Sequence, residues 1–100
     1  MIFTSKITTL EKNRYSILTN DLNHCYICKK PKQHLHEIYY GKNRINSMKY
    51  GCVVPLCFRC HNRIHHDCTV DIQLKNKCEN KFKEIYPDIN FLDIFHRTYI

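Results

Sequence analysis

GCVVPLCFRCHNRIHH, residues 51–66, decides the fold of this chain. Its two adjacent valines favour extended structure and Pro55 excludes the middle of a helix, so CVVPLC predicts a β-strand. From Cys57 onward, FRCHNRIHH has no helix breaker and no alternation of polar and apolar residues, and it predicts a short helix. The stretch therefore predicts a strand that runs into a helix, with cysteines at the junction and histidines along the helix.

Two C-x-x-C pairs occur in the chain, Cys25 with Cys28 and Cys57 with Cys60. Two such pairs supply the four thiolates of a closed tetrahedral structural Zn²⁺ site. Residues 29–56 would then form a β-hairpin with the zinc at its base. Two alternatives stay open: one pair is a redox couple, or the cysteines are simply buried.

The other three cysteines have no partner at ligand spacing, and we expect them to be small buried residues: Cys52, Cys68 and Cys78. Seven cysteines cannot all pair in internal disulfides, and the N-terminus shows no apolar signal-peptide core. We therefore expect a protein of a reducing cytoplasm, without a membrane-spanning segment.

Histidines form a second cluster of metal-binding side chains. His61 and His65 are four residues apart and share a helix face, whereas His66 is turned about a third of a revolution away. Upstream, LHEIYYG predicts a strand that ends in a turn at Gly41. Alternation along it places His34 and His36 on one face and Glu37 on the other, unless a bulge intervenes.

The rest of the chain is less distinctive. Residues 1–22 contain two runs of β-formers, which predict a hairpin or an extended arm. Residues 70–86 have apolar side chains at helical spacing up to Pro87, and residues 89–96 predict a last short helix. We divide the chain into an arm (1–22), a core (23–67) and a helical extension (68–100), all in one compact domain.

The charge of the chain indicates a polyanionic partner. Sixteen lysines and arginines against nine acidic residues give a net charge of +7 over 100 residues. The alternative without a functional role is that the basic surface only keeps the protein soluble. A domain of this size has a small core, so a structural staple such as zinc is expected.

These motifs together resemble the HNH endonuclease family, the ββα-metal nucleases, and in particular its small phage and prophage proteins. LHEIYYGKNR is followed by S-x-x-Y-G-x-V-V-P-L-C-x-x-C-H-x-x-x-H, and the family pattern covers Asn23 to His66. The resemblance implies an α+β fold, a small zinc-clasped ββα-metal (HNH) module with additional C-terminal helices. It also implies that the hairpin and helix enter the minor groove and present one divalent ion to the scissile phosphate.

Carried over by position, the resemblance assigns the four paired cysteines to the structural zinc. It assigns His61 and His65 to the catalytic ion. His36 and Glu37 match an adjacent pair in which the first residue usually binds metal and the second, usually histidine, is the general base. Glutamate at that second position leaves four readings open: His36 is the base with a shifted register, Glu37 is the base, the Glu37 carboxylate binds metal, or catalysis is lost. The middle asparagine of the motif is also replaced, and three residues are candidates for its place: Asn46, Ser47 and Asn62.

The sequence thus predicts a metal-dependent DNA endonuclease or nickase that hydrolyses phosphodiester bonds by a one-metal mechanism. Its predicted catalytic residues are His36, Glu37, His61 and His65, with His36, His61 and His65 as ligands of Mg²⁺, Mn²⁺, Ni²⁺ or Zn²⁺. Predicted phosphate contacts are Lys42, Arg44, Arg59 and Arg63.

The expected partner is double-stranded DNA in a bacterial or phage-infected cell, and a homodimer would turn nicks into double-strand breaks. The alternative function is a catalytically inactive, zinc-stabilised HNH-like module that binds DNA or another protein.

Overall fold

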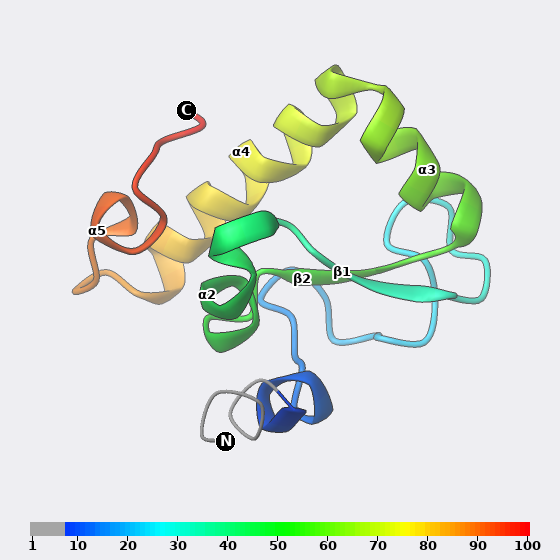
Figure 1. Cartoon of the computed structure of the whole chain (residues 1–100), viewed down its shortest axis with the longest axis horizontal. Helices are drawn as coiled ribbons and strands as arrows, with labels where there is room; N and C mark the ends of the chain where they lie inside the picture. The colour runs from blue at the N-terminus through cyan, green and yellow to red at the C-terminus, as the bar shows by residue number, and fades with distance from the viewer. Residues whose placement is uncertain (1–7) are drawn as a thin grey trace.

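The centre of the molecule is an antiparallel hairpin of two short strands, β1 (His34–Glu37) and β2 (Val53–Leu56). We describe residues 8–100 in a computed structural model (Figure 1). The register pairs His34 with Leu56 and Glu37 with Val53, without a bulge. All four residues of β2 are buried, so this strand is covered by the elements that pack around it. Both predicted strands are confirmed.

Helix α3 (Phe58–His66) follows β2 after the single residue Cys57. Cys57 is extended and its Sγ accepts a hydrogen bond from the Cys60 N–H, so the thiol is the N-cap of the helix. Cys60 and Ile64 form the buried face. The predicted strand-to-helix junction is confirmed.

Between the strands the chain forms a 3₁₀ turn, η1 (Gly41–Asn43), and a helix, α2 (Arg44–Lys49), where we expected only a loop. Gly41 and Gly51 flank this segment with φ of +70° and +74°, a region that favours glycine. A Cβ on Gly51 would lie 2.5 Å from the Tyr15 ring. The absence of a side chain at Gly51 therefore allows Tyr15 of the N-terminal segment to pack against this turn.

The C-terminal helices supply most of the apolar core. Helix α4 (Cys68–Ile85) begins after the N-cap Asp67, and α5 (Phe91–Phe95) begins after the N-cap Asn90. An aromatic cluster joins the hairpin to both helices, with its rings buried: Tyr39, Phe82, Phe91 and Phe95. The two predicted helices are confirmed, with shorter bounds for the last one.

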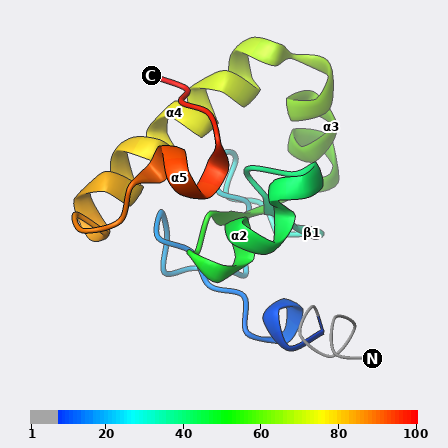
Figure 2. The ribbon, with the colours of Figure 1, turned by 60° about the vertical axis from the view of Figure 1, so that its left-hand side comes forward.

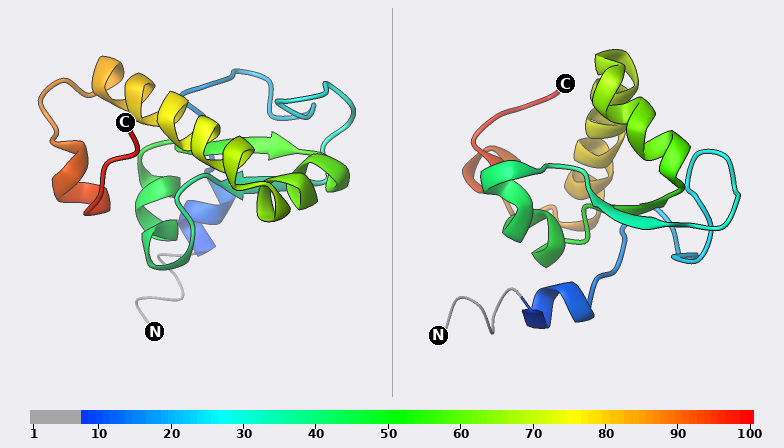
Figure 3. Two further views of the ribbon diagram at one scale, coloured as in Figure 1. Left: turned by 90° about the horizontal axis from the view of Figure 1, so that it is seen from above. Right: turned by 45° about the vertical axis from the view of Figure 1, so that its right-hand side comes forward.

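The elements are arranged on both sides of the hairpin. Helices α3 and α4 meet at an angle above it, and the N-terminal segment lies below it (Figure 1 and the right panel of Figure 3). Helix α5 follows the end of α4 that is remote from α3, and the C-terminal segment runs back along α4, where Thr98 and Tyr99 bond to Glu79 (Figure 2). The architecture is a small α+β fold with a two-stranded sheet.

The N-terminal segment differs from the predicted hairpin. Residues 8–12 are helical, and residues 14–20 have no helix or strand. Within residues 8–22 the hairpin interpretation is therefore wrong, while residues 1–7 lie outside the described part of the chain. Tertiary contacts fix this segment: the Ile17 N–H donates to the Gly51 carbonyl, and the Tyr15 hydroxyl donates to the Lys49 carbonyl.

Two further findings concern earlier expectations. Cys52 and Cys78 are buried, as expected, but Cys68 is exposed at the first position of α4. Among residues 8–100, no helix combines the length and the apolar character that crossing a bilayer requires.

Candidate metal centres

The four paired cysteines converge at one end of the hairpin. One ligand atom from each of Cys25, Cys28, Cys57 and Cys60 lies within 4.8 Å of all the others, and the Cys28 and Cys57 sulfurs are 3.6 Å apart. The group could hold a zinc ion, because four sulfur donors this close match the donor set of a closed tetrahedral site.

Local backbone geometry shapes the first cysteine pair. The Cys25 N–H donates to the Lys30 carbonyl and the Lys29 N–H to the Cys25 carbonyl, while Lys29 takes a left-handed conformation (φ +68°). This tight turn points both thiols the same way. The Tyr26 N–H donates to the Pro55 carbonyl of β2, which fixes the turn against the second cysteine pair.

The pKa values of three of these thiols are shifted, and not all in the same direction. Burial disfavours the Cys25 thiolate, but backbone N–H groups of Cys28, Cys57 and Ile27 outweigh it and lower the pKa of Cys25 to about 6. The Cys60 N–H lowers the pKa of Cys57, whereas burial and the neighbouring thiols raise the pKa of Cys60. The fold thus stabilises thiolates at this position, and thiolates are the form that binds metal.

Three histidines converge at a second place, between β1 and α3. His36 comes from the strand, and His61 and His65 come from successive turns of the helix. One ligand atom of each lies within 4.8 Å of the others, and the Nε2 atoms of His61 and His65 are 3.3 Å apart. The ring centroids of His36 and His61 are separated by 5.3 Å. The structure therefore brings together the three histidines that the sequence analysis assigned to one ion.

The environment favours the neutral form of two of these rings, those of His36 and His61. Burial, followed by the neighbouring His61 and His65, lowers the pKa of His36 to about 4, against an opposing effect of Asp71 and Glu37. Burial and the neighbouring histidines also lower the pKa of His61. Neutral imidazole is the form that binds metal, so these residues fit a divalent cation.

His36 itself has an unmet polar atom. Only 4% of the residue is exposed, and its Nε2 atom is enclosed without a hydrogen-bond partner among residues 8–100. Buried ring nitrogens normally have a partner. This buried nitrogen is therefore left without a protein partner among the described residues.

Alternation along β1 is confirmed by the residues that flank His36. The His34 ring lies on the same side and stacks on His61, with 4.7 Å between centroids. The structure does not bring Glu37 into the histidine cluster. Its Oε1 accepts hydrogen bonds from Arg14 at 2.5 Å and from Arg44 at 3.2 Å.

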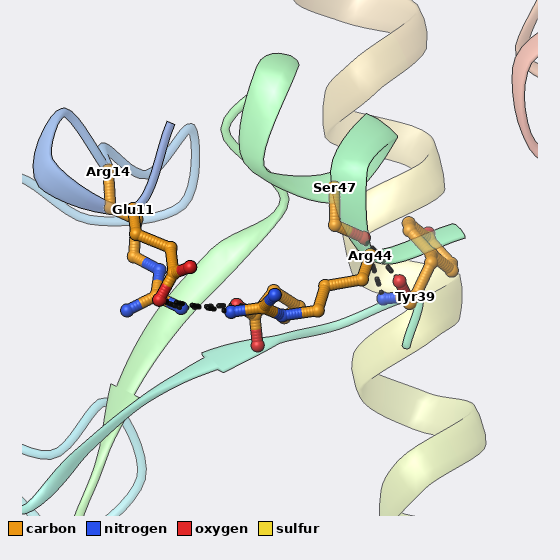
Figure 4. A network of polar contacts seen from close by, with 6 residues as sticks. Glu11, Arg14, Tyr39, Arg44 and Ser47 are labelled. Atoms are coloured by element: carbon orange, nitrogen blue, oxygen red, sulfur yellow. Dashed lines mark hydrogen bonds and ion pairs between the residues drawn. The ribbon is translucent and has the colours of Figure 1, made fainter. Parts of the chain in front are cut away.

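Glu37 belongs to a network of four charged residues that joins the N-terminal helix to the hairpin and α2. Arg44 also pairs with Glu11 at 3.3 Å. Figure 4 shows Glu11 and Arg14 on the N-terminal segment facing Arg44, while Ser47 contacts the backbone of Tyr39. Glu37 therefore bridges parts of the chain that are remote in sequence.

The predicted phosphate contacts divide into two groups. Lys42, Arg59 and Arg63 are exposed, and Arg59 and Arg63 line a surface cavity of about 470 Å³ beside the cysteines, together with Lys30. Arg44, by contrast, is engaged by two carboxylates. Of the exposed predicted contacts, Arg59 and Arg63 lie on α3 and Lys42 lies on η1.

The candidates for the middle asparagine also separate. The Asn46 side chain donates to the Ile94 carbonyl, and the Ser47 hydroxyl bridges the backbone N–H and carbonyl of Tyr39. Asn62 is exposed on α3. Ser47 is the candidate that bonds to Tyr39, which lies two residues after the end of β1 and three residues after His36.

Sequence reasoning missed one polar group beside the histidines, formed by Tyr40, Asp71 and Lys75. Tyr40 donates to Asp71 at 3.1 Å, and Lys75 pairs with Asp71 at 2.9 Å. The signal was present, because Asp71 and Lys75 fall at the helical spacing of the buried Leu74 and Cys78. Two charged residues on an apolar helix face indicate a polar contact across it.

The chain matches no protein-family model, no curated protein and no solved structure. The resemblance to the HNH family therefore rests on the motifs and their spacing.

Proposed function

We propose that this protein is a metal-dependent DNA endonuclease or nickase of the HNH type. The observation that carries the proposal is the meeting of His36, His61 and His65, from a strand and a helix, with ligand atoms within 4.8 Å of one another. A packing role does not require three imidazoles whose ligand atoms lie this close together.

In this proposal the four cysteines hold a structural Zn²⁺. The zinc ties the turn at residues 25–30 to the N-terminus of α3, and it thereby fixes the direction in which α3 presents His61 and His65. Because one hundred residues enclose a small core, this tie contributes a large part of the stability.

The three histidines hold a second divalent ion. When bound, such an ion polarises a phosphodiester and stabilises the charge that develops on the leaving oxygen. Three imidazole donors favour Mn²⁺, Ni²⁺, Co²⁺ or Zn²⁺ over Mg²⁺, which prefers oxygen ligands. We therefore propose a transition-metal ion for this site.

Two roles fit His36, that of third ligand and that of proton acceptor for the attacking water. Both require the ring at its present place beside α3. Glu37 takes neither role in this proposal, because its carboxylate lies on the opposite strand face and accepts from two guanidinium groups. Its role is to hold β1, α2 and the N-terminal segment together.

Double-stranded DNA is the proposed substrate. The chain carries a net charge of +7, and the exposed Arg59 and Arg63 are on the same helix as His61 and His65. Contacts from these arginines to phosphates would place the backbone of one strand against α3.

A nicking assay tests the proposal. Zinc-loaded protein is incubated with supercoiled plasmid and, separately, with Mg²⁺, Mn²⁺, Co²⁺ or Ni²⁺. We expect nicking that depends on the added ion and is lost in His36→Ala, whose circular dichroism stays native. His66→Ala, which removes an exposed histidine of α3 outside the cluster, is the matched control. Undiminished nicking by His36→Ala would remove the histidine cluster from the mechanism.

One observation favours a second candidate, a non-catalytic module that binds DNA. The residue at the family's base position, Glu37, is held by Arg14 and Arg44, and an inactive relative would retain the frame without that base. This candidate predicts mobility shifts of DNA that weaken steeply with salt, with no cut product for any ion.

A further inference from the structure

Asp71 is a buried carboxylate with one oxygen engaged and the other free. It lies in the first turn of α4 and is 8% exposed. Its Oδ2 accepts from the Tyr40 hydroxyl at 3.1 Å and pairs with Lys75 at 2.9 Å. Its Oδ1 is enclosed and has no hydrogen-bond partner among residues 8–100. A carboxylate fixed by one oxygen in this way presents the other oxygen in a defined direction.

Tyr40 connects Asp71 to the histidine cluster. The Tyr40 ring, which binds Asp71, lies 6.0 Å from the His36 ring and 5.9 Å from the His65 ring between centroids. The negative charge of Asp71 also acts on His36, where it opposes the lowering of the pKa by burial. Asp71 is therefore a neighbour of His36 from the side of α4.

Two of the three enclosed, unpartnered side-chain atoms in residues 8–100 occur at this place. They are His36 Nε2 and Asp71 Oδ1, and the third is Arg14 Nε in the network around Glu37. A nitrogen that can donate and an oxygen that can only accept are complementary. Of the two His36 ring nitrogens, only Nε2 is enclosed in this way, which leaves Nδ1 for a ligand.

We propose that Asp71 is the outer carboxylate of the three-histidine site. Its Oδ1 accepts from His36 Nε2–H through one bridging water, and His36 Nδ1 is then the nitrogen that would hold the ion. Tyr40 and Lys75 hold the carboxylate in place. Such a carboxylate fixes the tautomer and orientation of a metal-binding histidine and strengthens its donor nitrogen. The inference rests on the proposed function only in that an ion binds the three histidines.

Lys75 adds a constraint of its own. Its ammonium lies 4.3 Å from the centroid of the Tyr40 ring, so the cation contacts both members of the Tyr40–Asp71 pair. This arrangement balances the charge of the buried carboxylate.

The test is a calorimetric titration of Co²⁺ into zinc-loaded protein. Asp71→Asn keeps the shape of the side chain, but its single oxygen goes to Tyr40 and Lys75, and its amino group then faces His36. We expect Co²⁺ binding to weaken about 10- to 100-fold. Asp88→Asn, an exposed change of equal charge, is the matched control and should stay within about twofold of wild type. Wild-type affinity in Asp71→Asn would overturn the inference.

A second variant guards against a folding defect. The zinc content of the four-cysteine site and the circular dichroism report whether each variant is folded. If Asp71→Asn does not fold, Tyr40→Phe decides, because it removes only the hydroxyl that holds Asp71. A severalfold weaker Co²⁺ affinity supports the inference, and unchanged affinity overturns it.

Failure of this inference is distinguishable from failure of the proposed nuclease function. Wild-type protein that binds Co²⁺ more tightly than Asp71→Asn but nicks no plasmid supports the role of Asp71 and contradicts the nuclease. Wild-type protein that binds no Co²⁺ at the histidines overturns the role of Asp71.

Discussion

The two clusters of metal-binding side chains share helix α3 and differ in almost everything else. Two of the four cysteines come from a tight turn and two from the N-cap and first turn of α3, and backbone N–H groups lower the pKa of Cys25 and Cys57. The three histidines come from side-chain spacing on a strand and a helix, with His65 exposed and His36 buried. Backbone N–H groups therefore stabilise the ligand form of two cysteines, whereas the histidine cluster depends on where side chains project from β1 and α3. The first is therefore suited to hold the fold together, and the second can exchange ligands.

The largest expected effect comes from the cysteine cluster. Cys25→Ser removes one thiolate, and a structural zinc contributes about 10 kcal/mol or more to domains of this kind, which equals or exceeds the stability of a typical small domain. We expect the variant to lose its cooperative thermal transition by circular dichroism. Cys68→Ser, at an exposed cysteine outside the cluster, should melt like wild type. A native transition in Cys25→Ser would contradict the structural role of the cysteines.

The histidine cluster should respond in the opposite way. His61→Ala removes a ligand from a partly exposed position, so we expect nicking to fall to background while the free energy of unfolding changes by less than about 1 kcal/mol. The paired measurements are plasmid nicking and urea denaturation. If His61→Ala unfolds the protein as Cys25→Ser does, the two clusters do not differ in role.

A substitution of Glu37 should have a smaller effect than those of Cys25 and His61, and it tests whether Glu37 stabilises the fold or takes part in the reaction. Glu37→Gln removes the charge that Arg14 and Arg44 share, and partial exposure of both arginines limits the loss to about 1 kcal/mol. Urea denaturation measures this loss, and nicking by the folded fraction should persist. Loss of nicking at unchanged stability would instead assign Glu37 to the chemistry.

The smallest expected effect is on the salt dependence of DNA binding, and it distinguishes the exposed Arg63 from Arg44, which is paired with carboxylates. Arg63→Gln removes an exposed cation beside the cysteines, and we expect the slope of log affinity for DNA against log salt to fall by about one. Arg44→Gln should leave that slope unchanged, because Arg44 is engaged by Glu11 and Glu37. Equal slopes for the two variants would mean that α3 does not face the DNA backbone.

Much of this comparison follows from local sequence. The C-x-x-C spacing, the i and i+4 histidines and the alternation along β1 are properties of short segments, and short segments determine strand faces and helix faces. That is why the sequence predicted the cysteine pairs, the shared helix face of His61 and His65, the strand-to-helix junction and the opposite directions of His36 and Glu37. The meeting of His36 with the helix histidines was instead an expectation from the resemblance to the HNH family.

The errors arose where distant residues decide the outcome. Residues 15–19 contain β-formers, yet Tyr15 and Ile17 satisfy their contacts with Lys49 and Gly51 instead of a second strand. Arg44 stays a predicted phosphate contact, but its ion pairs with Glu11 and Glu37 could not be seen from local sequence. Asp71 was overlooked because its burial depends on Tyr40, which lies 31 residues away in the chain.

The most direct test of the account is a titration of nicking against bound metal. Metal-free protein receives one equivalent of Zn²⁺, which fills the four-cysteine site, and then increasing Mn²⁺ or Co²⁺, with supercoiled plasmid as substrate. The account predicts a folded protein without activity after the first equivalent and nicking that rises as the second ion binds. Full nicking with one equivalent of Zn²⁺, or none at any level of the second ion, would contradict it.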